Sequence, residues 1–197
     1  SDAQFDFYAC TGAVTNNIIS SGQGQSGEPP QLSVLNNINS SRDLVTMSIG
    51  GNDAKFVKIV AFCFAHDSCN TVQPFSPYLD VMLGDLFPLW VPVIKDRLVN
   101  VYSELKNATP NAATLVLDYP ILVSGTECDA VKVPSHDNLL LSESEQLFLR
   151  NANQQLNDAV SQAAAQVGLH YVSVANHFTG HGICGLKDDW INGLVTY

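Results

Sequence analysis

The sequence predicts an α/β fold, specifically a three-layer sandwich in which a central, mostly parallel sheet is flanked by helices. Two observations lead to this prediction. Apolar runs typical of buried strands alternate with amphipathic helical segments, and the resulting order is strand, helix, strand, helix, strand, helix, strand. A length of 197 residues suits one hydrophobic core, so we expect residues 1–197 to form a single domain.

The first half of the chain is expected to alternate between strands and short helices. These elements are a strand over Phe5–Cys10, a short helix after Gly12, a brief helix over Leu32–Ile38, a strand over Asp43–Gly50, and a helix after Asn52. The strand over Asp43–Gly50 is a continuous apolar run, the kind found in strands that are buried on both faces. In the helix that follows, Phe56, Val57 and Val60 are expected to face the core.

The second half repeats this alternation. Its expected elements are a helix from Val93, a strand over Thr114–Pro120, a helix after Ser142, and a strand over Leu169–Ala175. The helix after Ser142 has the clearest signals, because Ser142 and Glu145 have the spacing of a capping box and Gly168 suits the C-cap. Residues 71–92, rich in proline and aromatic side chains, are expected to pack on the sheet as a kinked helical segment. The alternative is that this section forms part of an acyl-chain pocket or a flap over one.

The charge of the chain argues against a nucleic-acid partner. Nine basic and nineteen acidic residues give a formal net charge of −10, and no basic cluster is present to contact phosphates. No apolar run approaches the roughly 18 residues that would span a bilayer, so we expect no transmembrane segment. We also expect a monomer that uses no cofactor.

The five cysteines predict disulfide bonds and therefore an oxidising, extracellular compartment. Cys63 and Cys69 lie close together in sequence and could close a small loop. Cys128 and Cys184 both lie in glycine-containing loops and could pair at long range. Cys10 is then left unpaired, and its partner would belong to another chain or to a part of the protein outside these residues.

The histidines do not predict a metal site. His177 and His181 are four residues apart, but a glycine-containing loop is not the helix that would turn both toward one metal ion. We therefore expect no metal.

Polar and glycine residues follow two of the expected strands. In a parallel sheet the ligand crevice lies beyond the carboxyl ends of the strands, which is where Gly12 and Asn52 are expected. A glycine N–H and an asparagine amide at such ends can hold a developing oxyanion during acyl transfer. The alternative is that Asn52 simply caps the following helix.

Three segments together resemble the SGNH (GDSL-type) hydrolases, most closely their secreted lipase and esterase branch known from actinomycetes. They are "ACTGA", "DLVTMSIGGNDAKF" and "FTGHGICGLKDDWINGL", from the start, middle and end of the chain. The resemblance implies a flavodoxin-like three-layer fold and a serine ester hydrolase. It also implies that the backbone N–H of Gly12 and the side chain of Asn52 form the oxyanion hole. Asp53 would then be structural, and His181 would line the substrate crevice.

Two of the family's sequence blocks are absent from the chain. It contains no Gly-Asp-Ser, the family's nucleophile block, and no His-Pro of the block that carries the base. We therefore expect the nucleophile serine and the catalytic histidine to lie outside these residues. The domain would be truncated at both ends, inactive or nearly so as given, and Cys10 would lack a disulfide partner from the upstream part.

The expected binding partner of the protein is an ester substrate, which is a lipid or an acylated small molecule or glycan. The alternative is a non-catalytic SGNH-like module that binds a glycan, lipid or protein.

Overall fold

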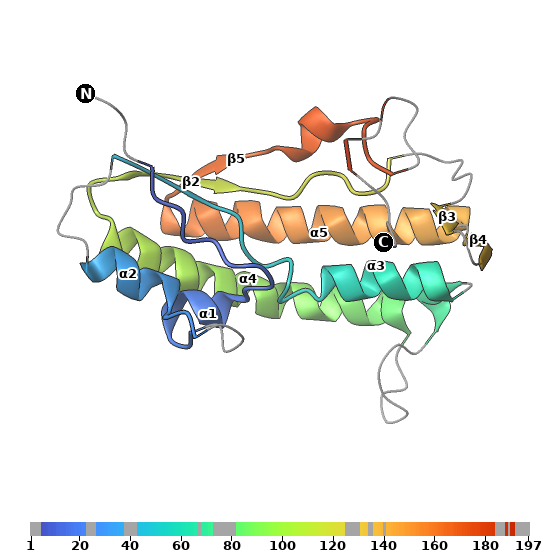
Figure 1. Cartoon of the computed structure of the whole chain (residues 1–197), viewed down its shortest axis with the longest axis horizontal. Coiled ribbons are helices and arrows are strands. Elements are labelled where there is room, and N and C mark those ends of the chain that lie inside the picture. Colours follow the sequence, from blue (N-terminus) through green and yellow to red (C-terminus); the bar gives the residue numbers. More distant parts are fainter. Residues whose placement is uncertain are drawn as a thin grey trace.

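A parallel sheet of three strands organises the structure (Figure 1). The computed structural model describes residues 5–22, 27–37, 43–66, 68–72, 82–124, 131–133, 136–139, 141–183, 188 and 190–191. Within them, β1 (Leu44–Met47), β2 (Ala113–Leu117) and β5 (His170–Val172) pair in the order β1-β2-β5. The predicted α/β class, with a parallel sheet flanked by helices, is confirmed.

The strand pairing places all three carboxyl ends at one edge of the sheet. Leu44 pairs with Ala113 and Leu115 with His170, both in parallel register. Parallel neighbours require a crossover, and helices supply it: α3 (Phe56–Ala65) and α4 (Leu83–Ala108) lie between β1 and β2 in sequence. The segments that follow the strands therefore gather at one end of the sheet.

Two long helices, α4 and α5 (Glu143–Val167), form the main helical layer. They lie side by side beneath the sheet in Figure 1, and α5 contacts both β2 and β5. Their facing residues, including Leu98, Tyr102 and Leu156, are almost completely buried. Burial of this apolar surface is the main driving force for packing the layer against the sheet.

The ends of α5 match the sequence prediction. Ser142 is the N-cap, and its hydroxyl oxygen accepts a bond from the Glu145 N–H while the Glu145 carboxylate accepts one from the Ser142 N–H, as in a capping box. Gly168 follows the last turn with a φ of 74°, a left-handed conformation that favours glycine. The other carboxylate oxygen of Glu145 accepts a bond from the Cys69 N–H at 2.9 Å, so α5 also anchors a distant loop.

The smaller elements lie around this framework. They are α1 (Thr15–Ile19), α2 (Gln31–Asn37), the 3-10 helices η1 (Cys69–Thr71) and η2 (Ala175–Phe178), and an antiparallel pair, β3 (Val131–Val133) and β4 (His136–Leu139). The short helices expected after Gly12 and near residues 32–38 are therefore present. The β3–β4 pair was not predicted.

Two strand predictions need correction. Residues 5–10 are not a strand: their alternating pattern is present, but Phe5 and Phe7 are 83% and 72% exposed, and no strand among the described residues pairs with them. An extended segment becomes a strand only through such pairing. β1 is shorter than expected and is not buried on both faces: Val45 and Met47 pack against the core, whereas Leu44 and Thr46, on the opposite face, are exposed.

Two helix predictions also need correction. The helix expected from Val93 is continuous with the second half of residues 71–92, which were expected to form a kinked helical segment: α4 begins at Leu83 and contains Pro88 and Pro92. Proline weakens a helix by removing an N–H donor, but Leu83 and Phe87 are fully buried, and this packing overrides the local cost. In α3, Val57 faces solvent and not the core.

The cysteines lie as follows. Cys63 and Cys69 form a disulfide with an S–S distance of 2.00 Å, and Cys10 is a free thiol. The expected Cys128–Cys184 pair lies outside the described residues. No helix in the described part of the chain is both long enough and apolar enough to cross a membrane.

Candidate active site

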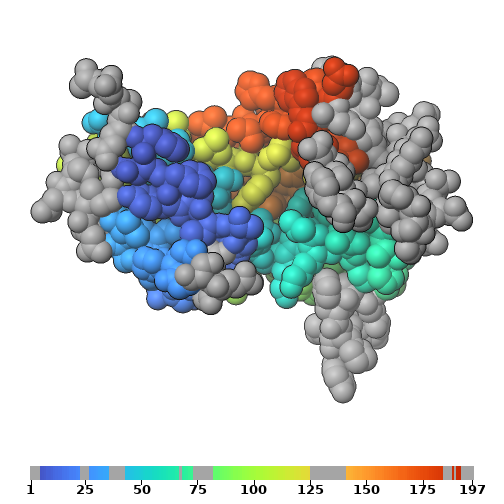
Figure 2. Space-filling model, viewed as in Figure 1, coloured from blue at the N-terminus to red at the C-terminus, as the bar shows by residue number. Residues whose placement is uncertain are grey.

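The candidate site lies where the strands end. Figure 2 shows a depression there: residues that follow β2 form its floor, between the N-terminal segment, α3 and the residues that follow β5. The loop after β1 carries Asn52, and a hydrogen bond from Asn52 to Ala13 places this loop beside the turn of Gly12. Asn52 therefore follows a strand as predicted, whereas the turn of Gly12 follows an extended segment that is not a strand.

The first loop presents Gly12 to solvent. Gly12 has a φ of 79°, in the left-handed region that favours glycine, and is exposed. The Ala13 N–H bonds to the Cys10 carbonyl at 3.2 Å, which closes the turn, and α1 begins two residues later at Thr15. The Gly12 backbone is therefore fixed at the start of a helix and remains accessible.

The second loop presents Asn52. Gly50, with a φ of 114°, lets the chain leave β1 sharply, and the Ala54 N–H returns to the Gly50 carbonyl at 2.9 Å. Asn52 is exposed, and its side chain does not cap α3, whose N-cap residue is Lys55 and has no side-chain cap. The capping alternative for Asn52 is therefore wrong. Its amide donates instead to the Ala13 carbonyl at 2.9 Å.

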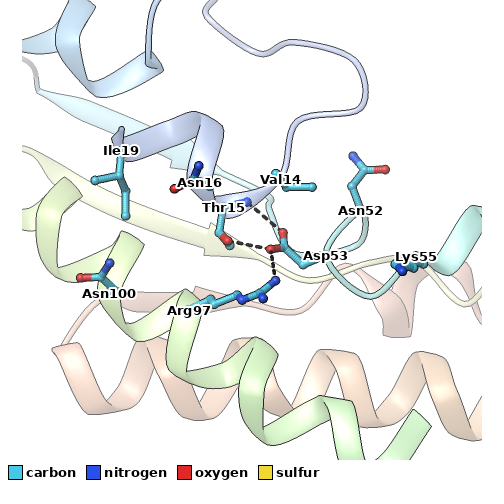
Figure 3. A pocket seen from close by; sticks show the side chains of 9 residues that line it. All are labelled: Val14, Thr15, Asn16, Ile19, Asn52, Asp53, Lys55, Arg97 and Asn100. Carbon is cyan, nitrogen blue, oxygen red and sulfur yellow. Dashed lines mark hydrogen bonds and ion pairs between the residues drawn. The ribbon is translucent and has the colours of Figure 1, made fainter. Parts of the chain in front are cut away.

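Asp53 fastens the two loops together (Figure 3). Its carboxylate accepts bonds from the Thr15 N–H at 2.9 Å and from the Thr15 hydroxyl at 2.6 Å, and Arg97 forms an ion pair with it at 3.4 Å. The Asp53 side chain is only 1% exposed. Together with the Asn52–Ala13 bond, these contacts hold the turn of Gly12 beside Asn52.

This arrangement supplies two neutral donors on adjacent, cross-linked loops. An asparagine amide has two N–H bonds, and the one that Asn52 gives to Ala13 orients the side chain while leaving the second for a ligand. Preorganised donors of this kind stabilise negative charge that develops on a reacting carbonyl oxygen.

Tyr119, which was not predicted to belong to the site, contacts the loop that carries Asn52. Its hydroxyl oxygen accepts a bond from the Gly51 N–H at 2.8 Å, and burial raises the pKa of that hydroxyl. The Asn157 side chain on α5 binds both the N–H and the carbonyl of Tyr119, at 3.0 and 2.9 Å. α5 thereby holds the segment on which the Asn52 loop rests.

The contact between Gly51 and Tyr119 predicts that Gly51→Ala will destabilise the protein. A Cβ at position 51 would lie 3.0–3.1 Å from three atoms of the Tyr119 side chain, which is itself held in place. Overpacking of this kind costs about 1–3 kcal/mol. Urea denaturation should show this loss. Tyr119→Phe, which loses only the hydrogen bond, should cost about 1 kcal/mol. An unchanged midpoint in Gly51→Ala would contradict the contact.

Asp118, also missed from sequence, fastens the ends of β2 and β5. It is 3% exposed and accepts four hydrogen bonds: from the hydroxyls of Tyr171 and Ser173, at 2.5 and 2.8 Å, and from the N–H groups of Val174 and Ala175, at 2.6 and 3.1 Å. No local pattern reveals this role, because every donor is more than fifty positions away in sequence.

The raised pKa of the Tyr171 hydroxyl predicts that the protein loses stability at alkaline pH. Burial, together with its bond to Asp118, raises the pKa of the Tyr171 hydroxyl to about 12 from an ordinary value of 10.0. The folded state thus holds this proton more tightly than the unfolded state, so the stabilisation is complete below pH 10 and is lost as pH rises toward 12. Unfolding free energies measured between pH 8 and 12 should fall less steeply in Tyr171→Phe. Equal slopes would contradict the assignment.

His181 is held by the C-terminal loop. Its ring stacks on Trp190 with centroids 3.6 Å apart, and its Nδ1 lies 2.8 Å from the Asp188 carbonyl oxygen. In the described part of the chain none of its hydrogen bonds reaches the loops of Gly12 or Asn52. The described residues also contain no group of three or more His, Cys, Asp or Glu side chains that could hold a metal ion.

Comparisons with known proteins identify the fold and the family of this chain. Lipase 1 of Streptomyces coelicolor is 31% identical over 198 residues, which cover 98% of this chain and 61% of that lipase. The crystal structure of phospholipase A1 from Streptomyces albidoflavus superimposes with a TM-score of 0.71 at 29% identity, covering 97% of this chain and 69% of that one. An extracellular lipase from Streptomyces rimosus, 24% identical, shares the fold with a TM-score of 0.71, over 98% of this chain and 70% of that one.

The chain thus spans about three fifths of the length of the curated lipase it matches. The sequence model of the GDSL-like lipase/acylhydrolase family matches residues 2–193, nearly the whole chain. This chain belongs to the GDSL-like lipase/acylhydrolase family.

Proposed function

We propose that this chain is the oxyanion-binding part of a secreted, monomeric serine ester hydrolase that acts on lipids or other acylated molecules. The Gly12 N–H and the Asn52 amide hold the oxyanion. The observation that carries the proposal is the cross-linking of their loops by the bond from Asn52 to the Ala13 carbonyl and by the bonds between Asp53 and Thr15. Family membership and the names of the relatives, a lipase and a phospholipase A1, support the ester as substrate.

The remaining catalytic groups are assigned to sequence outside this chain. A serine attacks the ester carbonyl, and a histidine takes its proton and passes it to the leaving alcohol, as in other serine hydrolases. The support is that the chain contains neither Gly-Asp-Ser nor His-Pro. Secretion is supported by the Cys63–Cys69 disulfide, because disulfides persist mainly in oxidising compartments.

The test compares turnover of a short-chain nitrophenyl ester by two proteins. The 197-residue chain alone should be inactive, whereas a longer protein in which Gly-Asp-Ser precedes it and His-Pro follows it should turn over. Turnover by the chain alone at the rate of the longer protein would contradict the assignment of nucleophile and base. An inactive longer protein that still binds lipid or glycan would support the non-catalytic alternative.

A further inference from the structure

The backbone immediately before Asn52 is fixed at Gly51. The Gly51 N–H donates to the Tyr119 hydroxyl oxygen at 2.8 Å, and the Gly51 carbonyl oxygen accepts a bond from the Phe56 N–H at 3.0 Å. The carbonyl oxygen of Asn52 accepts a bond from the Lys55 N–H at 3.1 Å. The bonds from Phe56 and Lys55 close the turn on itself, whereas the bond to Tyr119 ties it to a different part of the fold.

The turn needs such a tie because it begins with two consecutive glycines. Gly50 has a φ of 114°, and glycine has more backbone freedom than any other residue. A Cβ at position 51 would lie 3.0–3.1 Å from atoms of the Tyr119 side chain, so the ring lies directly against the Gly51 backbone. Tyr119 therefore supplies both packing and a hydrogen-bond acceptor to a stretch of chain that has little stiffness of its own.

Tyr119 is itself held in place. Asn157, which is 4% exposed on α5, binds the N–H and the carbonyl of Tyr119 at 3.0 and 2.9 Å. The Ser48 side chain, just after β1, also hydrogen-bonds the Tyr119 hydroxyl. The phenolic oxygen is therefore a fixed point to which the Gly51 N–H is attached.

The position of this backbone matters because it sets the direction of the Asn52 amide. One N–H of the amide donates to the Ala13 carbonyl, so the direction of the second N–H depends on where the Asn52 backbone lies. Oxyanion donors must lie about 2.7–3.1 Å from the developing oxyanion. A misplacement of about 1 Å near a reacting centre can lower the rate by up to roughly 100-fold.

We propose that Tyr119 is a positioning residue of the hydrolase reaction. Its hydroxyl fixes the Gly51 peptide and, through that peptide, aims the Asn52 amide at the oxyanion. Tyr119 does not touch the substrate, so it affects kcat and not KM. This role rests on the proposed function, because Asn52 must itself bind the oxyanion for its direction to matter.

Removal of the hydroxyl tests this role in the longer, active protein. Tyr119→Phe keeps the ring against Gly51 and should lower kcat about tenfold, as for a displacement of less than about 1 Å. KM should stay within about twofold of the parent value. Tyr171→Phe is the matched control: it also loses one hydroxyl, which bonds to Asp118, and its kcat should stay within about twofold of the parent. Equal losses of kcat in the two variants would overturn the role of Tyr119.

A double-mutant cycle asks whether Tyr119 acts through Asn52. In the Asn52→Ala protein, Tyr119→Phe should lower kcat by less than about twofold, because the amide that it aims is absent. A further tenfold loss in that background would mean that Tyr119 acts by another route, contrary to the proposal. Parental kcat in Asn52→Ala would contradict the proposed oxyanion role. Parental kcat in Tyr119→Phe beside an impaired Asn52→Ala would contradict only the role of Tyr119.

NMR of the same 15N-labelled proteins gives a readout that does not depend on turnover. In Tyr119→Phe the Gly51 amide proton loses its acceptor, so its signal should move upfield and the proton should exchange faster with solvent. The side-chain amide signals of Asn52 should move as well, whereas Tyr171→Phe should leave all of these signals in place. A shifted Gly51 amide beside unchanged Asn52 signals would show that the two residues are not linked and would refute the proposal.

Discussion

Asp118→Ala is expected to reduce the free energy of unfolding by about 3 kcal/mol or more, because it removes a buried charged acceptor and leaves its donors without a partner. The four donors come from the end of β5 and the residues after it, and they lie 2.5–3.1 Å from the carboxylate. Water cannot easily replace the lost acceptor, since Asp118 is almost completely buried. Urea denaturation of the parent and the variant measures this loss.

Two matched variants show whether the carboxylate acts as this acceptor. Asp118→Asn retains one carbonyl oxygen and should lose less stability than Asp118→Ala. Ser173→Ala removes one donor of the four and should cost about 1 kcal/mol. If Asp118→Ala were no less stable than Ser173→Ala, the junction between β2 and β5 would not depend on this side chain.

Asn52→Ala is expected to lower kcat about 100- to 1000-fold in the longer, active protein, since one oxyanion donor is worth roughly 3–4 kcal/mol. KM should change little, because the bond forms only as charge develops on the carbonyl oxygen. Steady-state kinetics on a nitrophenyl ester measure both quantities. Equal turnover in the parent and Asn52→Ala would remove Asn52 from the mechanism.

The control for this variant must account for the structural bond from Asn52 to Ala13. Thr15→Val removes the hydroxyl bond to Asp53 and so loosens the same pair of loops without touching the Asn52 amide. It should lower stability while keeping kcat within about tenfold of the parent. A loss of kcat as large as that of Asn52→Ala would mean that loop position, and not the amide donor, accounts for the effect.

The features that the sequence predicted correctly are those determined by neighbouring residues. Ser142, Glu145 and Gly168 specify the ends of α5 locally, and the structure has them as expected. A helix was expected from Val93 with a kinked helical segment before it, whereas the structure has one helix from Leu83, because the local cost of Pro88 and Pro92 is smaller than the gain from burying its first turns. The prolines can be recognised in the local sequence, but the tertiary packing that offsets their cost cannot.

The same distinction applies to the candidate site. The sharp turns at Gly12 and after β1 could be predicted, because glycine and asparagine mark such turns after apolar runs, but only Asn52 follows a strand. The supporting contacts could not be predicted, since Asp118, Tyr119 and Asn157 act on partners 38 to 68 positions away. The strand predicted over residues 5–10 is absent for a related reason. An alternating pattern indicates which side chains share a face, but a strand also needs a neighbouring strand with which to form hydrogen bonds.

The most direct test of the oxyanion assignment is the crystal structure of the longer enzyme after reaction with a phosphonate ester. The phosphonyl oxygen of such an adduct stands where the oxyanion of the tetrahedral intermediate would be. We predict that this oxygen lies about 2.7–3.1 Å from both the Gly12 nitrogen and the Asn52 Nδ2. A phosphonyl oxygen beyond hydrogen-bonding distance of both groups would contradict the assignment.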